Sequence, residues 1–253
     1  MKTKTLVVGV GLLAALSSSA LAAGAGASAY EGSLLTWDSG KRFEPLYDGN
    51  LQRLSLDGYV LQQTRGMDYG SGPAREWKVM HAGATVGIDL TRWLTLKAGG
   101  GGSDLSVDGD NRDSGGEWLV GGQLRLLDYW MLEPLVSDEP YWLSVNVNGH
   151  YLGTTSNGGN EDVTWQELFG SVELSLTARP ERWGFIDRIG IFAGPAYSAI
   201  KADDGGGFGS ISQDRAFGFV GGLFLNPNNN VTLKAEVQSF DKVSIGGSVG
   251  FHF

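Results

Sequence analysis

No cysteine occurs among the 253 residues, so no disulfide framework holds this chain together. Basic residues are also few, because 19 lysines and arginines stand against 28 aspartates and glutamates. That acidic balance argues against a nucleic-acid partner, whose binding needs a basic footprint. The sequence has no internal repeat of roughly 20 to 50 residues, which argues against a solenoid or a propeller.

The long apolar run at the N-terminus is typical of an export signal. Lys2 and Lys4 precede apolar residues 6 to 16, and the small triplet Ala20-Leu21-Ala22 follows. This run is too short to span a bilayer, and no other long apolar run follows it, so no transmembrane helix is expected. We expect residues 1 to 22 to be a signal peptide. Its removal takes two lysines and lowers the net charge of −9 by two, to −11.

The rest of the chain is dominated by alternation between apolar and polar residues. From Val243 to Phe253, the apolar side chains fall on one parity, while serine, glycine and histidine fall on the other. This two-residue period is that of a strand with one apolar face. Nine earlier segments show the same period, at residues 51–62, 77–90, 93–103, 118–127, 141–153, 163–178, 188–197, 215–225 and 231–239.

Alternation alone fits two kinds of barrel. A small soluble barrel turns its apolar parity inward, whereas a membrane barrel turns it towards lipid. Aromatic residues at both ends of the segments favour the membrane barrel, because bilayer interfaces select such rings. The predicted outer belt holds Tyr59, Trp77, Trp118, Tyr151, Trp165, Tyr197 and Phe217, and the periplasmic belt holds Trp93, Tyr129, Trp130, Tyr141, Trp142, Trp183, Phe185 and Phe253.

We therefore predict an all-β fold, a transmembrane antiparallel up-and-down β-barrel over residues 51 to 253. About ten strands are expected, with eight as the alternative. Because membrane barrels have short periplasmic turns and longer external loops, the polar stretches 63–76, 104–117, 154–162 and 200–214 are predicted external loops. Residues 23 to 50 are interpreted as a periplasmic N-terminal arm or a plug segment in the barrel mouth.

The C-terminal segment resembles the assembly signal of bacterial outer-membrane β-barrels. The resemblance lies in the final F-H-F and the alternate apolar residues before it, above all Val249, Phe251 and Phe253. In layout the chain is similar to the small barrels of the OmpA, OmpX and Opa type, which have eight strands. The resemblance implies a Gram-negative outer membrane, insertion by the outer-membrane assembly machinery, and contact with outer-membrane lipids and lipopolysaccharide. It carries no activity, and we expect a monomer.

The polar parity of the predicted strands places ten charged side chains inside the barrel. Five acids and five bases in a narrow lumen favour mutual ion pairing, because an unpaired buried charge is costly. The main interpretation is a lumen filled by its own charges, and the alternative is a narrow polar conduit for ions or small solutes. The ten are Arg53, Asp57, Asp89, Lys97, Arg125, Glu167, Glu173, Arg188, Lys234 and Glu236.

Two arrangements of histidine raise the question of an enzyme. His150, Ser156 and Glu161 have the residue types of a base, a nucleophile and an orienting acid. Outer-membrane lipid deacylases and phospholipases, however, place the serine two residues after the histidine, and here the spacing is six. Omptin proteases need histidine and aspartate at the outer rim, and no such pairing is visible for His81 or His150. We expect no catalysis, with a lipid hydrolase as the second alternative.

Asp108, Asp110, Asp113 and Glu117 superficially resemble calcium ligands. Their spacing departs from the EF-hand pattern, because Arg112 stands where an oxygen ligand belongs. We therefore expect no metal and no cofactor. The sequence favours an outer-membrane protein with an envelope-structural or surface-interaction role, and a narrow porin is the alternative function.

Overall fold

Strands account for every regular element in the part of the chain that the computed structural model describes, residues 35–36, 54–69, 74–91, 93–108, 110–131, 141–158, 161–180, 186–203, 211–228 and 230–253. Within these ranges no helix is long and apolar enough to cross a membrane. The strands are β1 (Leu35–Thr36), β2 (Leu54–Asp68), β3 (Arg75–Asp89), β4 (Leu94–Val107), β5 (Asp110–Met131), β6 (Tyr141–Gly158), β7 (Glu161–Ala178), β8 (Arg188–Asp203), β9 (Ile211–Gln213), β10 (Phe217–Asn228), β11 (Val231–Ser239) and β12 (Val243–His252).

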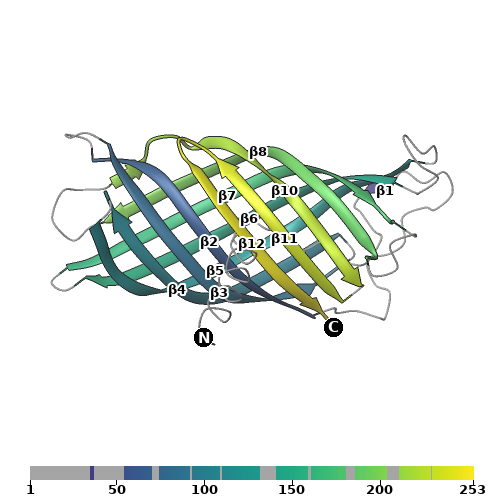
Figure 1. The fold of residues 1–253 in the computed structure, drawn as a ribbon, viewed down its shortest axis with the longest axis horizontal. Helices are drawn as coiled ribbons and strands as arrows, with labels where there is room; N and C mark the ends of the chain where they lie inside the picture. Colours follow the sequence, from purple (N-terminus) through teal and green to yellow (C-terminus); the bar gives the residue numbers. More distant parts are fainter. Residues whose placement is uncertain are drawn as a thin grey trace, which may run out of the picture.

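The ten long strands form one closed barrel (Figure 1). Each of β2 to β7 pairs antiparallel with the next strand, β8 pairs with β10, and β12 closes the ring by pairing with β2. The predicted all-β, antiparallel up-and-down barrel of about ten strands is confirmed. Short β1 lies parallel to β5 at Leu127 and Asp128, just past the residues of β5 that pair with β4.

The barrel narrows from ten strands to eight at the end opposite Phe253. The β11–β12 hairpin stops at a turn after Ser239, whereas β2 and β8 continue beyond it. There β9 takes the place of β10 to β12, because Ser212 pairs with β8 and Gln213 pairs with β2. An eight-stranded barrel is narrow enough for its own side chains to fill the interior.

Outward-facing side chains change from apolar to polar along the barrel. On β3, Val86 and Met80 face outward with exposed fractions of 55% and 44%, and Lys78 and Glu76 follow on the same face. We call the polar-surfaced part beyond this change the head and the apolar surface below it the apolar band. The change lies between Gly102 and Asp104 on β4, between Leu168 and Gln166 on β7, and between Ala199 and Lys201 on β8.

Above a layer of polar side chains at its lower edge, the head has an apolar interior. The interior behind the apolar band is rich in polar side chains but also holds a cluster of buried phenylalanines, Phe169, Phe192, Phe224 and Phe240. The head comprises residues 61–68 of β2, 75–79 of β3, 103–107 of β4, 114–117 of β5, 152–156 of β6, 163–167 of β7, 198–203 of β8, and β9. The head therefore has a polar outer surface over a largely apolar core, as in a soluble barrel, whereas the outer surface of the remainder is apolar. The core cluster of the head includes Leu61, Met67, Trp77, Val79, Leu105, Val107, Leu119, Leu152, Val163, Trp165, Ile200, Ala202 and Ile211.

Three residues of the predicted outer aromatic belt point into the barrel instead. Tyr59, Trp77 and Trp165 are only 3%, 1% and 2% exposed and belong to the same core cluster. The prediction failed because it used only the position of these residues at strand ends, although all three share the parity of polar residues such as Asp57, His81 and Glu167. Trp118 and Phe217 do face outward, with exposed fractions of 50% and 74%.

Most residues of the predicted long external loops are strands. Residues 104–107 and 110–117 continue β4 and β5, which meet at a tight turn where Asp108 has a φ of 52°. Residues 63–68 likewise continue β2, and 211–213 form β9. The loop prediction was wrong because paired strands in the head carry polar residues outward. The predicted signal peptide lies outside the described residues, as do residues 23–50 apart from β1.

Candidate functional site

Nine of the ten predicted lumen charges lie on described residues, and all nine face the interior. Arg53 lies outside the described residues. Two close ion pairs form among the nine: Lys97 Nζ lies 2.7 Å from Asp57 Oδ2, and Lys234 Nζ lies 3.2 Å from Glu236 Oε2. These pairs offset the desolvation cost of burying four charges.

Other lumen charges have partners close in the chain. Arg125 Nη1 lies 3.6 Å from Asp128 Oδ2, and Arg188 Nε lies 3.3 Å from Asp187 Oδ2. The Arg188 guanidinium also stacks 5.4 Å from the ring centroid of Trp142, which was assigned to the periplasmic belt. Asp89 accepts a hydrogen bond from Thr95 Oγ1 at 2.6 Å, and Glu173 accepts one from Ser171 Oγ at 2.7 Å.

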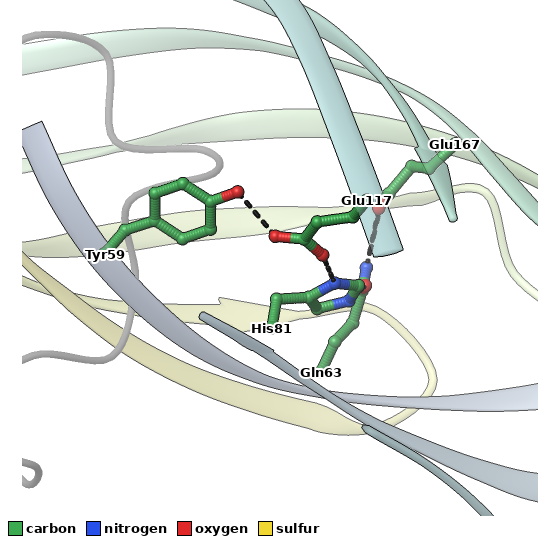
Figure 2. A network of polar contacts seen from close by, with 5 residues as sticks. All are labelled: Tyr59, Gln63, His81, Glu117 and Glu167. Atoms are coloured by element: carbon green, nitrogen blue, oxygen red, sulfur yellow. Dashed lines mark hydrogen bonds and ion pairs between the residues drawn. The ribbon is translucent and has the colours of Figure 1, made fainter. Parts of the chain in front are cut away.

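A network of buried polar side chains crosses the interior at the edge of the head (Figure 2). The hydroxyl of Tyr59 donates to Glu117 Oε1 at 2.5 Å, and Glu117 Oε2 lies 2.6 Å from His81 Nδ1. On the other side of the ring, His81 Nε2 lies 3.1 Å from Gln63 Oε1. Both ring nitrogens therefore face side-chain oxygens, and these two contacts fix the orientation of the imidazole.

The network continues through Glu167 to the opposite wall. Gln63 Nε2 donates to both carboxylate oxygens of Glu167, at 3.0 and 2.9 Å, and Ser198 Oγ donates to Glu167 Oε1 at 2.6 Å. The contacts thus join β2, β3, β5, β7 and β8. Because each of the two carboxylates has several donors, the network stabilises charged groups that are almost completely buried.

Glu167 is one of the predicted lumen charges, but most of this network was not predicted. Glu117 was placed in an external loop, and Tyr59 was placed in the outer aromatic belt. The signal that could have found Glu117 is parity, because it has the same parity as Gln123 and Arg125 and directly precedes the predicted segment 118–127.

Arg65 holds the junction at which the barrel narrows. It is fully buried, and its guanidinium donates to the Thr64 carbonyl oxygen, to Ser244 Oγ at 2.6 Å and to Gln238 Oε1 at 3.0 Å. Its Cζ lies 4.3 Å from the ring centroid of Phe240, in the turn that ends the β11–β12 hairpin. Arg65 therefore links β2 to both strands of that hairpin.

The core of the head is built around two tryptophans. The ring centroids of Trp77 and Trp165 lie 5.7 Å apart, and Trp77 Nε1 donates to the Tyr69 hydroxyl at 2.9 Å. Met67 and Ile211, which lie on β2 and β9 beside the point of closure, have exposed fractions of 0%. The interior of the eight-stranded section is therefore packed with apolar side chains.

The residues of the predicted hydrolase arrangement are not brought together. His150 is buried and stacks on Phe169, with ring centroids 4.9 Å apart and an interplanar angle of 13°. Ser156 lies six residues further along the continuous strand β6, which separates the two positions by about 20 Å. His81 is held by Glu117 and Gln63, so the histidine–aspartate pairing of an omptin is not found at this residue.

Of the calcium-like residues, Asp108 and Glu117 do not converge, and the side chains of Asp110 and Asp113 lie outside those that the structure describes. Asp108 accepts a hydrogen bond from the Glu76 backbone amide at 3.0 Å and lies 3.9 Å from Arg75 Nε, whereas Glu117 faces the interior. Across the described ranges, no group of three or more histidines, aspartates and glutamates is arranged to hold a metal ion.

The three residues of the predicted assembly signal share the outward face of the last strand. Phe251 and Phe253 have exposed fractions of 44% and 74%, and Val249 pairs with Leu233 on β11. Their recognition by the assembly machinery stays a prediction.

No protein-family model matches the sequence, and no curated protein matches it. Similar solved structures include the outer membrane protease OmpT from Escherichia coli, with 10% identity, a TM-score of 0.41, and coverage of 81% of this chain and 97% of that chain. An outer membrane channel from Pseudomonas putida F1 has 10% identity and a TM-score of 0.40, with coverage of 84% of this chain and 100% of that chain. The attachment invasion locus protein Ail of Yersinia pestis has 13% identity and a TM-score of 0.20, with coverage of 80% of this chain and 99% of that chain. Because these identities and TM-scores are low, the assignment of the fold is based on the strand pairing alone.

Proposed function

We propose that this chain is an integral outer-membrane β-barrel protein, exported through an N-terminal signal peptide, with an envelope-structural or surface-interaction role. The observation that carries the proposal is the reversal of polarity along the barrel. An apolar outer surface over a polar interior suits lipid, because lipid offers no hydrogen bonds to polar side chains. A polar outer surface over an apolar interior suits water.

The apolar band supports the membrane location. Outward side chains such as Ile191, Phe219 and Ile245 have exposed fractions of 61%, 69% and 56% on different strands of the ring. A water-soluble protein seldom exposes apolar side chains over so continuous a surface. In the proposed orientation, outer-membrane lipids and lipopolysaccharide contact the band, the assembly machinery inserts the barrel, and a monomer projects the head into the medium.

The filled head supports a barrel that does not conduct. We expect no stable single-channel steps from the purified chain in planar bilayers, because the Trp77–Trp165 core and the network through Glu117 and Glu167 occupy the interior. Flotation of the same preparation with lipid vesicles verifies insertion. Stable steps in an inserted preparation would refute a closed head and favour the narrow porin, the alternative suggested by the charged interior behind the apolar band.

The proposal also holds that the chain is not an enzyme. A matched pair of variants, His150→Ala and Ser156→Ala, tests the lipid hydrolase. We expect phospholipid and lipid A turnover to be the same in membranes carrying either variant or the unchanged chain. Turnover that is present with the unchanged chain and lost in both variants would favour the hydrolase instead.

A further inference from the structure

Glu173 is a buried carboxylate behind the apolar band that has no basic partner. Its exposed fraction is 4%, and it accepts a hydrogen bond from Ser171 Oγ at 2.7 Å. Among the described residues, no lysine or arginine nitrogen lies within ion-pair distance of Glu173, whereas Asp57 is paired with Lys97. A buried carboxylate without a counter-charge is costly to desolvate. Glu173 therefore favours a cationic partner.

Two asparagines beside Glu173 have amide oxygens without a hydrogen-bond partner. Asn146 Nδ2 donates to Ser175 Oγ at 3.1 Å, and Asn148 Nδ2 donates to Ser171 Oγ at 3.3 Å. The hydroxyl hydrogen of Ser171 is directed at Glu173, so its oxygen accepts from Asn148 and fixes that amide. The Oδ1 atoms of both asparagines are unsatisfied, and the two residues have exposed fractions of 6% and 4%. Because an unsatisfied buried acceptor is costly, both oxygens need a donor that the described residues do not supply.

Glu173, Asn146 and Asn148 line one part of the interior wall, which we call the acceptor patch. Asn146 pairs with Glu173 across β6 and β7, which places their Cβ atoms about 5 Å apart. Asn148 lies about 7 Å from Asn146 on the same face of β6, and the hydrogen bond from Ser171 turns the carboxylate towards it. Gln123 pairs with Asn148 from β5 and faces inward but is only partly buried, so the interior beside the patch is not filled.

The bases that face this interior already lie beside acids. They form four pairs: Lys97 with Asp57, Arg125 with Asp128, Arg188 with Asp187, and Lys234 with Glu236. Among the described acids behind the apolar band, Glu173 and Asp89 have no such base, and Asp89 accepts a hydrogen bond from Thr95 near the end of the barrel. The acceptor patch therefore combines one unbalanced negative charge with two unsatisfied amide oxygens.

We infer that the acceptor patch binds the primary ammonium group of a small solute. An ammonium group has three N–H donors and one positive charge, which complement two amide oxygens and one carboxylate. A metal ion fits less well, because only one of the three ligands is charged. The head is filled, so the solute enters from the opposite end of the barrel. This binding site goes beyond the proposed envelope role and does not depend on it.

The test uses the full chain folded in detergent and isothermal titration calorimetry with ethylammonium chloride. Tetramethylammonium is the matched probe, because it has the same charge and no N–H donor. We expect only ethylammonium to bind, and we expect E173Q to weaken its binding at least about tenfold, because a hydrogen bond to a charged group is lost. N148D adds a second carboxylate to the patch and should tighten binding about tenfold.

Asp89→Asn is the control variant, because it also changes an acid to an amide inside the barrel. Asp89 lies on β3, four strands from the strand that carries Glu173. Equal losses from E173Q and D89N would overturn the inference, because they would indicate a general attraction of cations to the lumen. Equal binding of the two probes, no binding of ethylammonium to the unchanged chain, or no gain from N148D would overturn it as well. The gel shift between unheated and heated samples verifies that each variant is folded.

Discussion

Replacing His81 by leucine tests the polar network at the edge of the head. The imidazole has an exposed fraction of 0% and contacts Glu117 at 2.6 Å and Gln63 at 3.1 Å. Leucine fills much of the same volume but offers no hydrogen bond. Glu117 keeps only its contact from Tyr59, and the amide oxygen of Gln63 loses its contact with the ring.

The expected loss follows from these two contacts. Leaving a buried neutral acceptor unsatisfied costs about 1 to 3 kcal/mol, and the cost is larger for a charged one. Breaking a buried charged pair typically costs about 3 to 5 kcal/mol. We therefore expect H81L to lower the free energy of unfolding by about 4 kcal/mol. E117M alone should cost about 3 kcal/mol, because it leaves donors of Tyr59 and His81 unpaired.

The double variant H81L/E117M gives the decisive comparison. Removing both partners leaves no buried unpaired carboxylate, so the double variant should cost about 4 kcal/mol instead of the sum of about 7. Guanidinium unfolding of the chain in phosphatidylcholine vesicles, followed by tryptophan fluorescence, measures all three values. If the losses of the two single variants add to that of the double variant within about 0.5 kcal/mol, His81 and Glu117 do not stabilise each other. An H81L variant as stable as the unchanged chain would likewise contradict a stabilising role of the network.

Three further changes test other parts of the structure. Among variants that retain a single tryptophan, brominated lipids should quench Trp118 strongly and Trp77 weakly, and equal quenching would contradict the inward position of Trp77. Gly99→Ala should prevent folding, judged by loss of the gel shift between unheated and heated samples, because its Cβ would collide with the Ala84 carbonyl oxygen. Gly116→Ala is the control, since no atom lies within 4 Å of its Cβ. Lys97→Met should lower the free energy of unfolding in guanidinium by about 3 to 5 kcal/mol, because it leaves Asp57 unpaired. A loss below about 1 kcal/mol would show that the Lys97–Asp57 pair does not stabilise the barrel.

The alternation of residues predicts the barrel because it reports directly on strands that have two different faces. Val243 to His252 form β12, and the segment 231–239 matches β11 residue for residue. The inward parity of Lys97 and Glu236 also follows from the same period. Strand count and the direction of most charged side chains are therefore accessible from sequence.

The head was not predicted because a period of two does not say which parity is buried. In β3, Trp77 and Val79 occupy the inward parity that Thr85 and Gly87 occupy further along the strand. The reversal looks in the sequence like the end of a strand and the start of a polar loop. Partners such as Glu117 and His81 meet only because strands distant in the chain are brought together by closure of the ring.

The reversal and the narrowing have a common structural origin in the short β11–β12 hairpin. Because the hairpin ends at Ser239, β9 can pair with β8 and β2 at once, and the ring loses two strands. The narrower ring can be filled by apolar side chains, so its strands no longer need lipid around them and can carry polar residues outward. Arg65 stabilises this transition because its hydrogen bonds link β2 to Gln238 and Ser244 where the ten-stranded and eight-stranded sections meet. The length of one hairpin thus determines both where the barrel closes and where its apolar surface ends.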